Sequence, residues 1–314
     1  SLGVRGSETE YLELLKGDLP ENNNLFAGIN TTWSRVKGAE KVGALLKKVE
    51  SNFSMQSPYT VLPDLLLALK ELEKLQDSYW KREKLKDIKL IIKQSLGLFQ
   101  EAVAMESAAT PGENIKVQLE FIHRSPVKVT LQSLQVLPTS MDTVMGMELA
   151  NNKGFKLSKQ IQVPKNIQLT SPYWLIDQWN LGVYTVSDEK LRGLPETPKS
   201  LKIKANYLIE GIPFSLESDI VYKIDDPVAG EVYQPLDIVP LVTSSIAEKV
   251  YIFNSDRSKT VSVKIKAGKD NVNGNAKLEV PQNWKVTPTE IPFTIDKKGQ
   301  ETIVVFTVTP SSEA

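Results

Sequence analysis

The feature that most constrains the fold of this chain is a change in the spacing of its apolar residues. Between residues 40 and 106 apolar residues recur every three or four positions, as in helices that bury one face. After Thr110-Pro111-Gly112 the spacing becomes two, which is typical of half-buried strands. The sequence therefore predicts a helical domain over residues 37–109, followed by β domains.

The helical part contains three apolar series. The first runs from Val42 to Phe53, and the second from Leu65 to Tyr79. Pro63 precedes the second series and is tolerated in a first helical turn, where its missing N–H needs no partner. The third series begins at Leu85 and continues through Ile88, Ile92, Leu96, Phe99 and Val103. Three helices packed as an antiparallel unit would bury all three series.

The rest of the chain alternates between extended stretches and turn signals. Over residues 110–226 the pattern predicts an antiparallel β-sandwich, with extended stretches at 115–121, 127–134, 156–163, 182–186, 201–209 and 212–222. Asp225-Asp226-Pro227 and Ala229-Gly230 predict a second boundary. Residues 227–314 fit a smaller immunoglobulin-like sandwich, with stretches at 232–242, 249–253, 260–267, 277–280 and 302–308. The expected fold class is multidomain α + β.

Residues 1–36 have few periodic apolar positions and contain the polar run Glu21-Asn22-Asn23-Asn24. They are expected to form an extended linker after a missing upstream domain, because the start of the sequence resembles neither a signal peptide nor a native start. The expected anchors of this arm are Leu12, Leu14, Leu15, Phe26 and Trp33.

Charge and composition argue against several function classes. The 38 Lys and Arg residues balance 38 Asp and Glu residues, so the chain lacks the net positive charge typical of nucleic-acid binding. It has no cysteine and one histidine, His123, which is expected at an ordinary strand position rather than in a metal site. No apolar run approaches the roughly 18–20 residues of a membrane-spanning helix. No catalytic residues and no cofactor are therefore assigned to this chain.

One stretch is a candidate ligand-binding site. Four aromatic rings, Tyr173, Trp174, Trp179 and Tyr184, lie within twelve residues, with Asp177, Gln178 and Asn180 between them. Exposed planar rings with polar neighbours can hold a sugar. The alternative, which we favour at this stage, is that the rings pack beneath a long loop, because large aromatic residues are usually buried.

Five stretches of the chain resemble a known family. They are 6–18 (GSETEYLELLKGD), 24–36 (NLFAGINTTWSRV), 173–175 (YWL), 182–188 (GVYTVSD) and 226–233 (DPVAGEVY). Together they are similar to the region after the catalytic domain in large PIG-L/LmbE-like deacetylases of Bacteroides-type bacteria. In that family an N-terminal α/β domain removes N-acetyl groups from glucosamine-containing substrates, with zinc held by a His-Pro-Asp-Asp stretch and a later His. That stretch is absent here.

The resemblance implies a non-catalytic accessory region that positions its enzyme on a glycan or the cell envelope. It also implies that zinc is bound only in the missing catalytic domain and that this domain is a partner of the chain. The resemblance further implies export to the periplasm or cell surface. Two alternatives remain open at this point. The chain could hold a hydrolase site built from carboxylates between domains, or its β domains could serve only structure or self-association.

Overall fold

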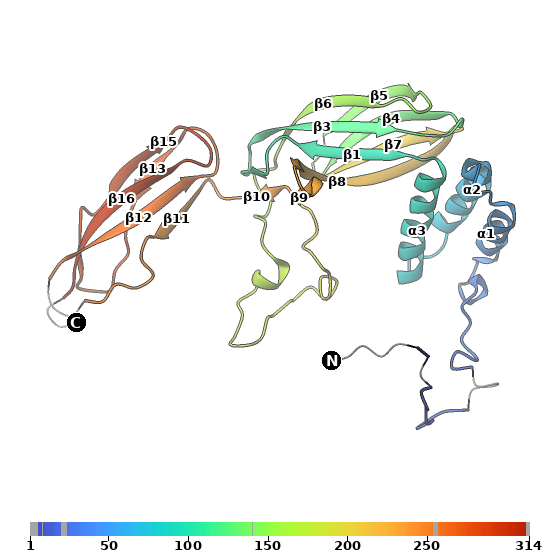
Figure 1. The fold of residues 1–314 in the computed structure, drawn as a ribbon, viewed down its shortest axis with the longest axis horizontal. Helices are drawn as coiled ribbons and strands as arrows, with labels where there is room; N and C mark the ends of the chain where they lie inside the picture. The colour runs from blue at the N-terminus through green and yellow to red at the C-terminus, as the bar shows by residue number, and fades with distance from the viewer. Residues whose placement is uncertain (1–5, 8, 20–23, 140, 254–256, 312–314) are drawn as a thin grey trace. The chain divides into compact units, whose positions relative to one another are not determined.

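A computed structural model describes residues 6–7, 9–19, 24–139, 141–253 and 257–311 (Figure 1). The chain divides into two compact units between Ser95 and Leu96. The first unit is helical, and the second consists of several β-sheets. The predicted order of a helical unit followed by β domains is therefore confirmed.

Three helices form the first unit: α1 (Glu40–Asn52), α2 (Leu62–Glu73) and α3 (Tyr79–Ser95). Helix α2 contacts both α1 and α3 and contributes most of the buried leucines. Pro63 lies in its first turn, as predicted. Two ion pairs join α1 to α2, Lys41 to Glu71 at 3.0 Å and Lys48 to Asp64 at 2.8 Å. No helix in the described part of the chain is long and apolar enough to cross a membrane.

The third helix is shorter than predicted. It ends at Ser95, and Phe99 and Val103 lie on a strand instead of the helix expected for them. Gly97, with a φ of 57°, explains the difference, because a glycine in the left-handed region is a common way to end a helix. Tyr79 begins this helix rather than closing the second apolar series. The division between the units therefore precedes the boundary predicted near residue 110.

The arm before α1 has fewer anchors than expected. Leu12, Leu15 and Phe26 are 72%, 90% and 70% exposed, and Leu14 is also exposed. Trp33 does anchor the arm. It lies in the 3-10 helix Trp33–Arg35 and packs closely against Gly43, where an added Cβ would lie only 3.0 Å from the Trp33 Cβ. Residues 1–5, 8 and 20–23 of the predicted linker lie outside the described residues.

One large sheet dominates the first part of the second unit. Its strands are ordered β5-β4-β7-β8-β1-β3-β6, and β9 also pairs with β8 (Figure 1). Their bounds are β1 Phe99–Ala104, β3 Asn114–Ile122, β4 Val129–Leu137, β5 Asp142–Leu149, β6 Phe155–Gln162, β7 Lys202–Ile209, β8 Ile212–Asp226 and β9 Gly230–Pro235. The short strands β2 (Ala108–Ala109) and β10 (Asp237–Ile238) form a separate pair.

Strand β8 links the two halves of this sheet. Residues 212–219 pair with β7, whereas residues 220–222 pair with β1 and residues 221–226 pair with β9. Inward residues alternate along β3 and β7, as the period of two predicts. On β4 a bulge between Leu131 and Ser133 shifts the alternation, so that Leu131 and Leu134 are both buried.

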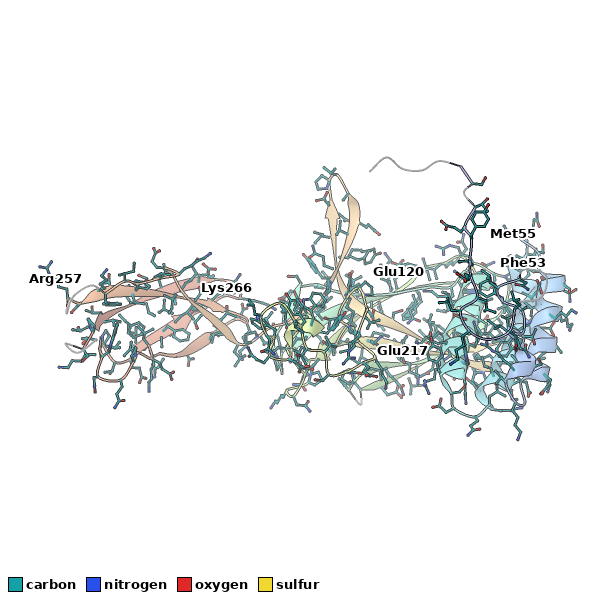
Figure 2. All side chains as sticks on the ribbon, turned by 90° about the horizontal axis from the view of Figure 1, so that it is seen from below. Phe53, Met55, Glu120, Glu217, Arg257 and Lys266 are labelled. Carbon is teal, nitrogen blue, oxygen red and sulfur yellow. The ribbon has the colours of Figure 1, made fainter. Side chains whose placement is uncertain are left out.

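Several β predictions in this part are wrong. The pairings β1–β8 and β2–β10 are parallel, so the sheets are not purely antiparallel. The boundary predicted at 226/227 falls inside the hairpin of β8 and β9, which projects as the pale orange ribbon in Figure 2. Residues 182–186 form no strand and lie in a loop. The sequence signals at Asp226 and Gly230 are those of a turn, and a turn alone does not separate domains.

The last part of the chain contains two further sheets. One has the order β11-β12-β16-β14, and β13 pairs with β15 in the other. The bounds are β11 Val242–Ile246, β12 Lys259–Ala267, β13 Val272–Ala276, β14 Lys285–Thr287, β15 Ile291–Ile295 and β16 Glu301–Thr309. Strands predicted at 260–267 and 302–308 are confirmed, whereas those at 249–253 and 277–280 are wrong.

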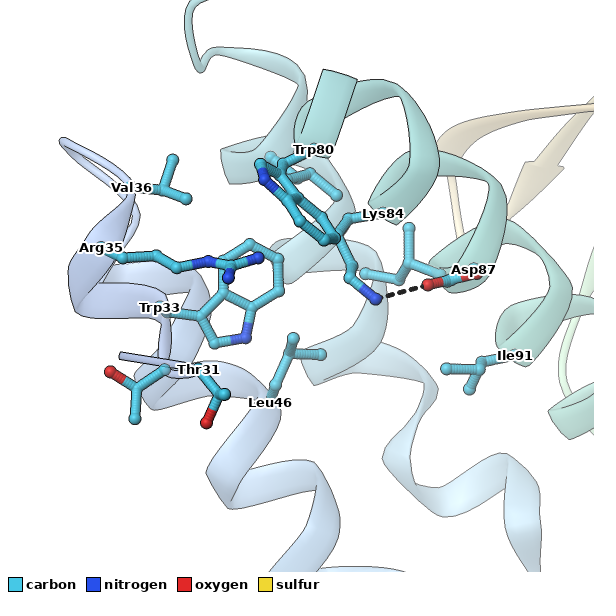
Figure 3. Close-up of a pocket in the computed structure, with 12 residues that line it drawn as sticks. Thr31, Trp33, Arg35, Val36, Leu46, Trp80, Lys84, Asp87 and Ile91 are labelled. Atoms are coloured by element: carbon cyan, nitrogen blue, oxygen red, sulfur yellow. Dashed lines mark hydrogen bonds and ion pairs between the residues drawn. The ribbon is translucent and has the colours of Figure 1, made fainter. Parts of the chain in front are cut away.

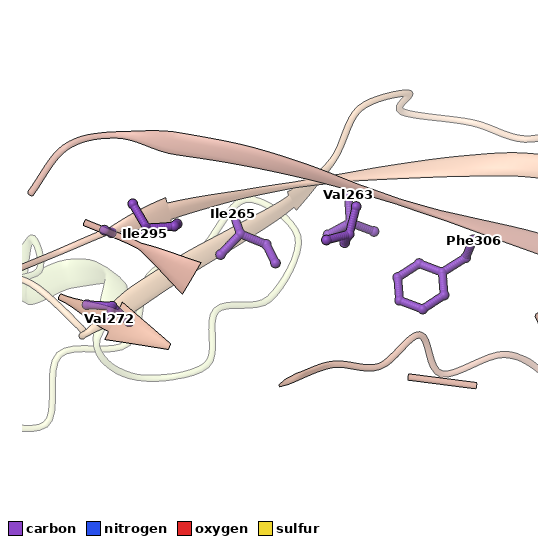
Figure 4. Packing of buried hydrophobic residues seen from close by; sticks show 7 residues of the cluster. Val263, Ile265, Val272, Ile295 and Phe306 are labelled. Atoms are coloured by element: carbon purple, nitrogen blue, oxygen red, sulfur yellow. The ribbon is translucent and has the colours of Figure 1, made fainter. Parts of the chain in front are cut away.

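Both of these sheets contribute to one apolar core (Figure 4). Val263 and Ile265 come from β12, Phe306 from β16, and Val272 and Ile295 from the two-stranded sheet. Phe306 is fully buried. Shared burial of these side chains stabilises the contact between the two sheets.

We expect Tyr207→Phe to destabilise the second unit. The buried Tyr207 hydroxyl donates to Gln100 Oε1 at 2.6 Å, and its loss leaves that oxygen without this donor, at a cost of about 1–3 kcal/mol. Burial raises the pKa of Tyr207. The unfolded chain therefore releases the phenol proton first, above about pH 10, and this contribution to stability falls as the pH rises further.

Urea unfolding of the wild type and of Tyr207→Phe at a series of pH values measures this effect. The difference in unfolding free energy should narrow above about pH 10. Tyr11→Phe, at a position that is 91% exposed, is the matched control and should equal the wild type at neutral pH. If the difference in unfolding free energy between the wild type and Tyr207→Phe stays constant across the alkaline range, the raised pKa of the buried Tyr207 hydroxyl is wrong.

Candidate functional site

The candidate site lies in the long connection between β6 and β7, residues 163–201, which we call the aromatic loop. This fully described segment contains the 3-10 helix Tyr173–Leu175 and an isolated bridge between Asn180 and Val183. Its base is tied to β10, because Ile238 N donates to Thr170 Oγ1 at 2.7 Å and Thr170 N donates to Ile238 O at 2.8 Å. Long loops held by such contacts often carry function.

Tyr173 is the buried anchor of this loop. It is 8% exposed, and its hydroxyl donates to Leu194 O at 3.0 Å. Its backbone N–H donates to Thr197 Oγ1, also at 3.0 Å. The Trp174 ring packs edge-on against the Tyr173 ring, with centroids 4.9 Å apart at 86°. Packing beneath the loop, the favoured sequence interpretation, thus describes Tyr173 but not all four rings.

Three of the four predicted rings line one open cavity of about 600 Å³. Tyr173 and Trp174 form one part of its lining, and Tyr184, which is 60% exposed, forms another. Thr185, Val186, Arg192 and Gly193 complete it. Trp174 is half-buried and also lines a neighbouring cavity of about 260 Å³. We call the larger space the aromatic cavity.

Trp179, the fourth predicted ring, is 53% exposed and does not line the aromatic cavity. It precedes the tight turn closed by Asn180 and Val183, whose backbone groups exchange two hydrogen bonds of 3.1 Å. Gly182 occupies this turn with a φ of 77°, which a glycine adopts without strain. The turn thus directs the chain back toward the cavity at Tyr184.

Polar contacts brace the wall of the aromatic cavity. Arg192 donates from Nε and Nη2 to Val186 O at 3.0 and 2.8 Å. Asp177 Oδ2 accepts from both Ser187 N and Ser187 Oγ, at 3.0 and 2.7 Å. Asp177, expected to hydrogen-bond a ligand, therefore holds the loop. Arg192 carries no sequence signal of its own, because it lies eight residues beyond Tyr184, the last of the clustered rings.

A polar cluster on β1, β8 and β9 groups two carboxylates around one lysine. Lys223 Nζ lies 3.2 Å from Glu101 Oε2 and 3.4 Å from Glu231 Oε1, and the Tyr233 hydroxyl donates to Glu101. That hydrogen bond is the main cause that raises the pKa of Tyr233 to about 12. Burial lowers the pKa of Lys223, but hydrogen bonding to Glu101 and its charge outweigh burial and raise it.

In this cluster the two carboxylates stabilise the Lys223 ammonium, and the carboxyl groups with a shifted pKa lie elsewhere in the described chain. Where the pKa of a described carboxyl group is shifted, at Glu71, Glu196 and Asp226, it is lowered. A general acid at neutral pH needs a raised carboxyl pKa. The alternative of a carboxylate hydrolase gains no support from these groups.

His123 does not fit the zinc site of the family that the sequence resembles. Its ring is 1% exposed, and Nε2 lies 2.8 Å from Leu149 O. It follows β3, rather than lying within a strand as expected. Among the described residues no group of three or more His, Asp and Glu side chains could hold a metal ion. That zinc belongs to an upstream domain stays a prediction.

Comparisons with known proteins identify no family. No family model and no curated protein match the chain. Solved structures that match include the alkylpurine DNA glycosylase AlkC of Pseudomonas fluorescens bound to DNA with an abasic site analog (10% identity, TM-score 0.20, 56% of this chain and 50% of that chain). Another is the sporulation control protein Spo0M of Bacillus subtilis (6% identity, TM-score 0.22, 67% of this chain and 90% of that chain). The chain thus spans half the length of the glycosylase chain, and neither likeness carries a fold or functional assignment.

We expect Tyr173 and Trp179 to differ sharply in their effect on stability. Tyr173→Ala removes a buried ring and its hydrogen bond to Leu194, and should cost about 3 kcal/mol. Trp179→Ala removes an exposed ring and should change the unfolding free energy by no more than about 0.5 kcal/mol. Urea unfolding measures both. Equal losses would show that Trp179 packs as the sequence suggested.

Proposed function

We propose that this chain is a non-catalytic accessory region that binds a glycan in the aromatic cavity. The observation that carries the proposal is the pair of Trp174 and Tyr184, which line an open cavity of about 600 Å³ on a braced loop. The volume falls within the ~300–1,000 Å³ of small-ligand sites. Flat rings favour sugars because the C–H face of a pyranose packs on them while its hydroxyl groups bond to neighbouring polar atoms.

The aromatic loop supplies both the flat rings and the polar atoms that a sugar site needs. Tyr173 is fixed by hydrogen bonds to Leu194 and Thr197 and in turn supports the Trp174 ring. Thr185 and Arg192 bring polar atoms to the same lining. Because these groups are held before any ligand arrives, binding would require little ordering of the loop.

We further propose that the region serves a PIG-L/LmbE-like, zinc-dependent N-acetylglucosamine deacetylase, exported to the periplasm or cell surface. The support is the sequence resemblance described above, and the partner would be the enzyme's own catalytic domain. A His-Pro-Asp-Asp stretch encoded upstream of residue 1 is the expected finding, and its absence from the coding sequence would overturn this part of the proposal.

We also propose that both β parts are β-sandwiches and that the last is immunoglobulin-like. In support, the sheets β11-β12-β16-β14 and β13-β15 share one core, and all pairings within them are antiparallel. Such modules commonly serve as rigid supports for binding loops.

Calorimetric titration with N-acetylglucosamine oligosaccharides tests the glycan proposal. Tyr184→Ala and Trp174→Ala should each weaken binding about tenfold, the effect expected for a ring at the centre of a binding site. Trp179→Ala, which removes a ring outside the cavity, is the matched control and should bind like the wild type.

Melting temperatures of all three variants separate binding from folding. Tyr184→Ala should melt like the wild type, because this ring is 60% exposed. If the wild type fails to bind these oligosaccharides and other envelope glycans, the accessory role reduces to structural support or self-association.

A further inference from the structure

The helical unit contains a second aromatic cavity, of about 320 Å³, which the proposed glycan site does not use. It lies between residues 31–36 and the three helices, and Figure 3 shows its lining. The apolar side chains of the lining include Trp33, Leu46, Leu72, Trp80, Ile88 and Ile91. Trp80 and Ile91 are still 45% and 43% exposed, so the cavity leaves large apolar surface in contact with water. We call it the helical cavity.

Arg35 places a positive charge at this cavity. Its guanidinium carbon lies 4.1 Å from the centroid of the Trp80 ring, a cation–π contact (Figure 3). Within the described part of the chain no carboxylate forms an ion pair with Arg35. Lys84, the other cation of the lining, is neutralised by Asp87 at 2.7 Å. The charged side chains of the lining therefore sum to one uncompensated positive charge.

We propose that the helical cavity binds a small amphipathic ligand with a flat apolar body and one carboxylate. The guanidinium carbon lies over the Trp80 ring, and no carboxylate of the described residues pairs with Arg35, so its N–H groups can form bidentate hydrogen bonds to a ligand carboxylate. The apolar body lies against Trp33 and Trp80. Charge complementarity selects the carboxylate, and the cavity volume of about 320 Å³ lies at the lower end of the ~300–1,000 Å³ range of small-ligand sites, which favours a small body.

Titration with 2-naphthoate and with 2-naphthamide tests this proposal, because the two probes share a body and differ in charge. The indole N–H signals of the protein in a two-dimensional NMR spectrum report the site. The naphthoate should shift Trp33 and Trp80 but leave Trp174, Trp179 and Trp284 in place, and the naphthamide should bind about tenfold more weakly. A glycan titration would act on Trp174 instead, so the two proposed sites fail or succeed independently.

Charge variants complete the test. Arg35→Gln should weaken naphthoate binding about tenfold while naphthamide binding stays unchanged. Lys37→Gln removes an exposed cation outside the lining and should affect neither probe. Trp80→Ala should weaken both. Equal binding of the two probes to the wild type, or no shift of Trp33 and Trp80 at about millimolar probe, would overturn the proposal.

Discussion

The second unit depends on the continuity of strand β8. Its first eight paired positions, residues 212–219, extend the ladder of β7, and its end continues into β1 and β9. The hydrogen bonds of one strand thus fix both halves of the sheet. The buried link from Tyr207 to Gln100 joins the same two halves through side chains. Because unpaired buried polar groups are costly, neither half can shift its register without losing these bonds.

The aromatic loop also connects the two halves of this sheet. Strand β6 ends the sheet on the β1 side, whereas β7, the next long strand along the chain, lies in the other half. The connection therefore crosses from one half to the other. The β3–β4 connection (residues 123–128) and the β5–β6 connection (residues 150–154) make the same crossing with far fewer residues, so the aromatic loop carries more chain than the crossing needs. The excess chain is stabilised by its own contacts, chiefly those of Tyr173, Asp177 and Arg192.

The periodicity of the sequence was sufficient to predict the type of most elements. The helical faces of α1 and α2 and the alternation of β3, β7, β12 and β16 agree with it. Periodicity failed where an apolar series continues past the end of a helix. Leu96 and Phe99 keep the helical spacing, but Gly97 between them adopts a left-handed conformation that ends the helix. Strand pairing also depends on residues far apart in the sequence, so the hairpin at Asp226 could not be distinguished from a linker.

The candidate site shows a related limit. The density of rings predicted the region, but ring density does not reveal which rings face one space. Trp179 is five residues after Trp174, yet the turn at Gly182 leaves it outside the cavity that Tyr184 enters. Conversely, Trp33 and Trp80 are far apart in the sequence and line one cavity because three helices bring them together. In both places a neighbour contacts the exposed aromatic surface: the hydrogen-bonded Tyr173 packs against Trp174, and the Arg35 guanidinium lies over Trp80. Such preorganisation lowers the entropy cost of binding, which is the physical basis on which both cavities are proposed as binding sites.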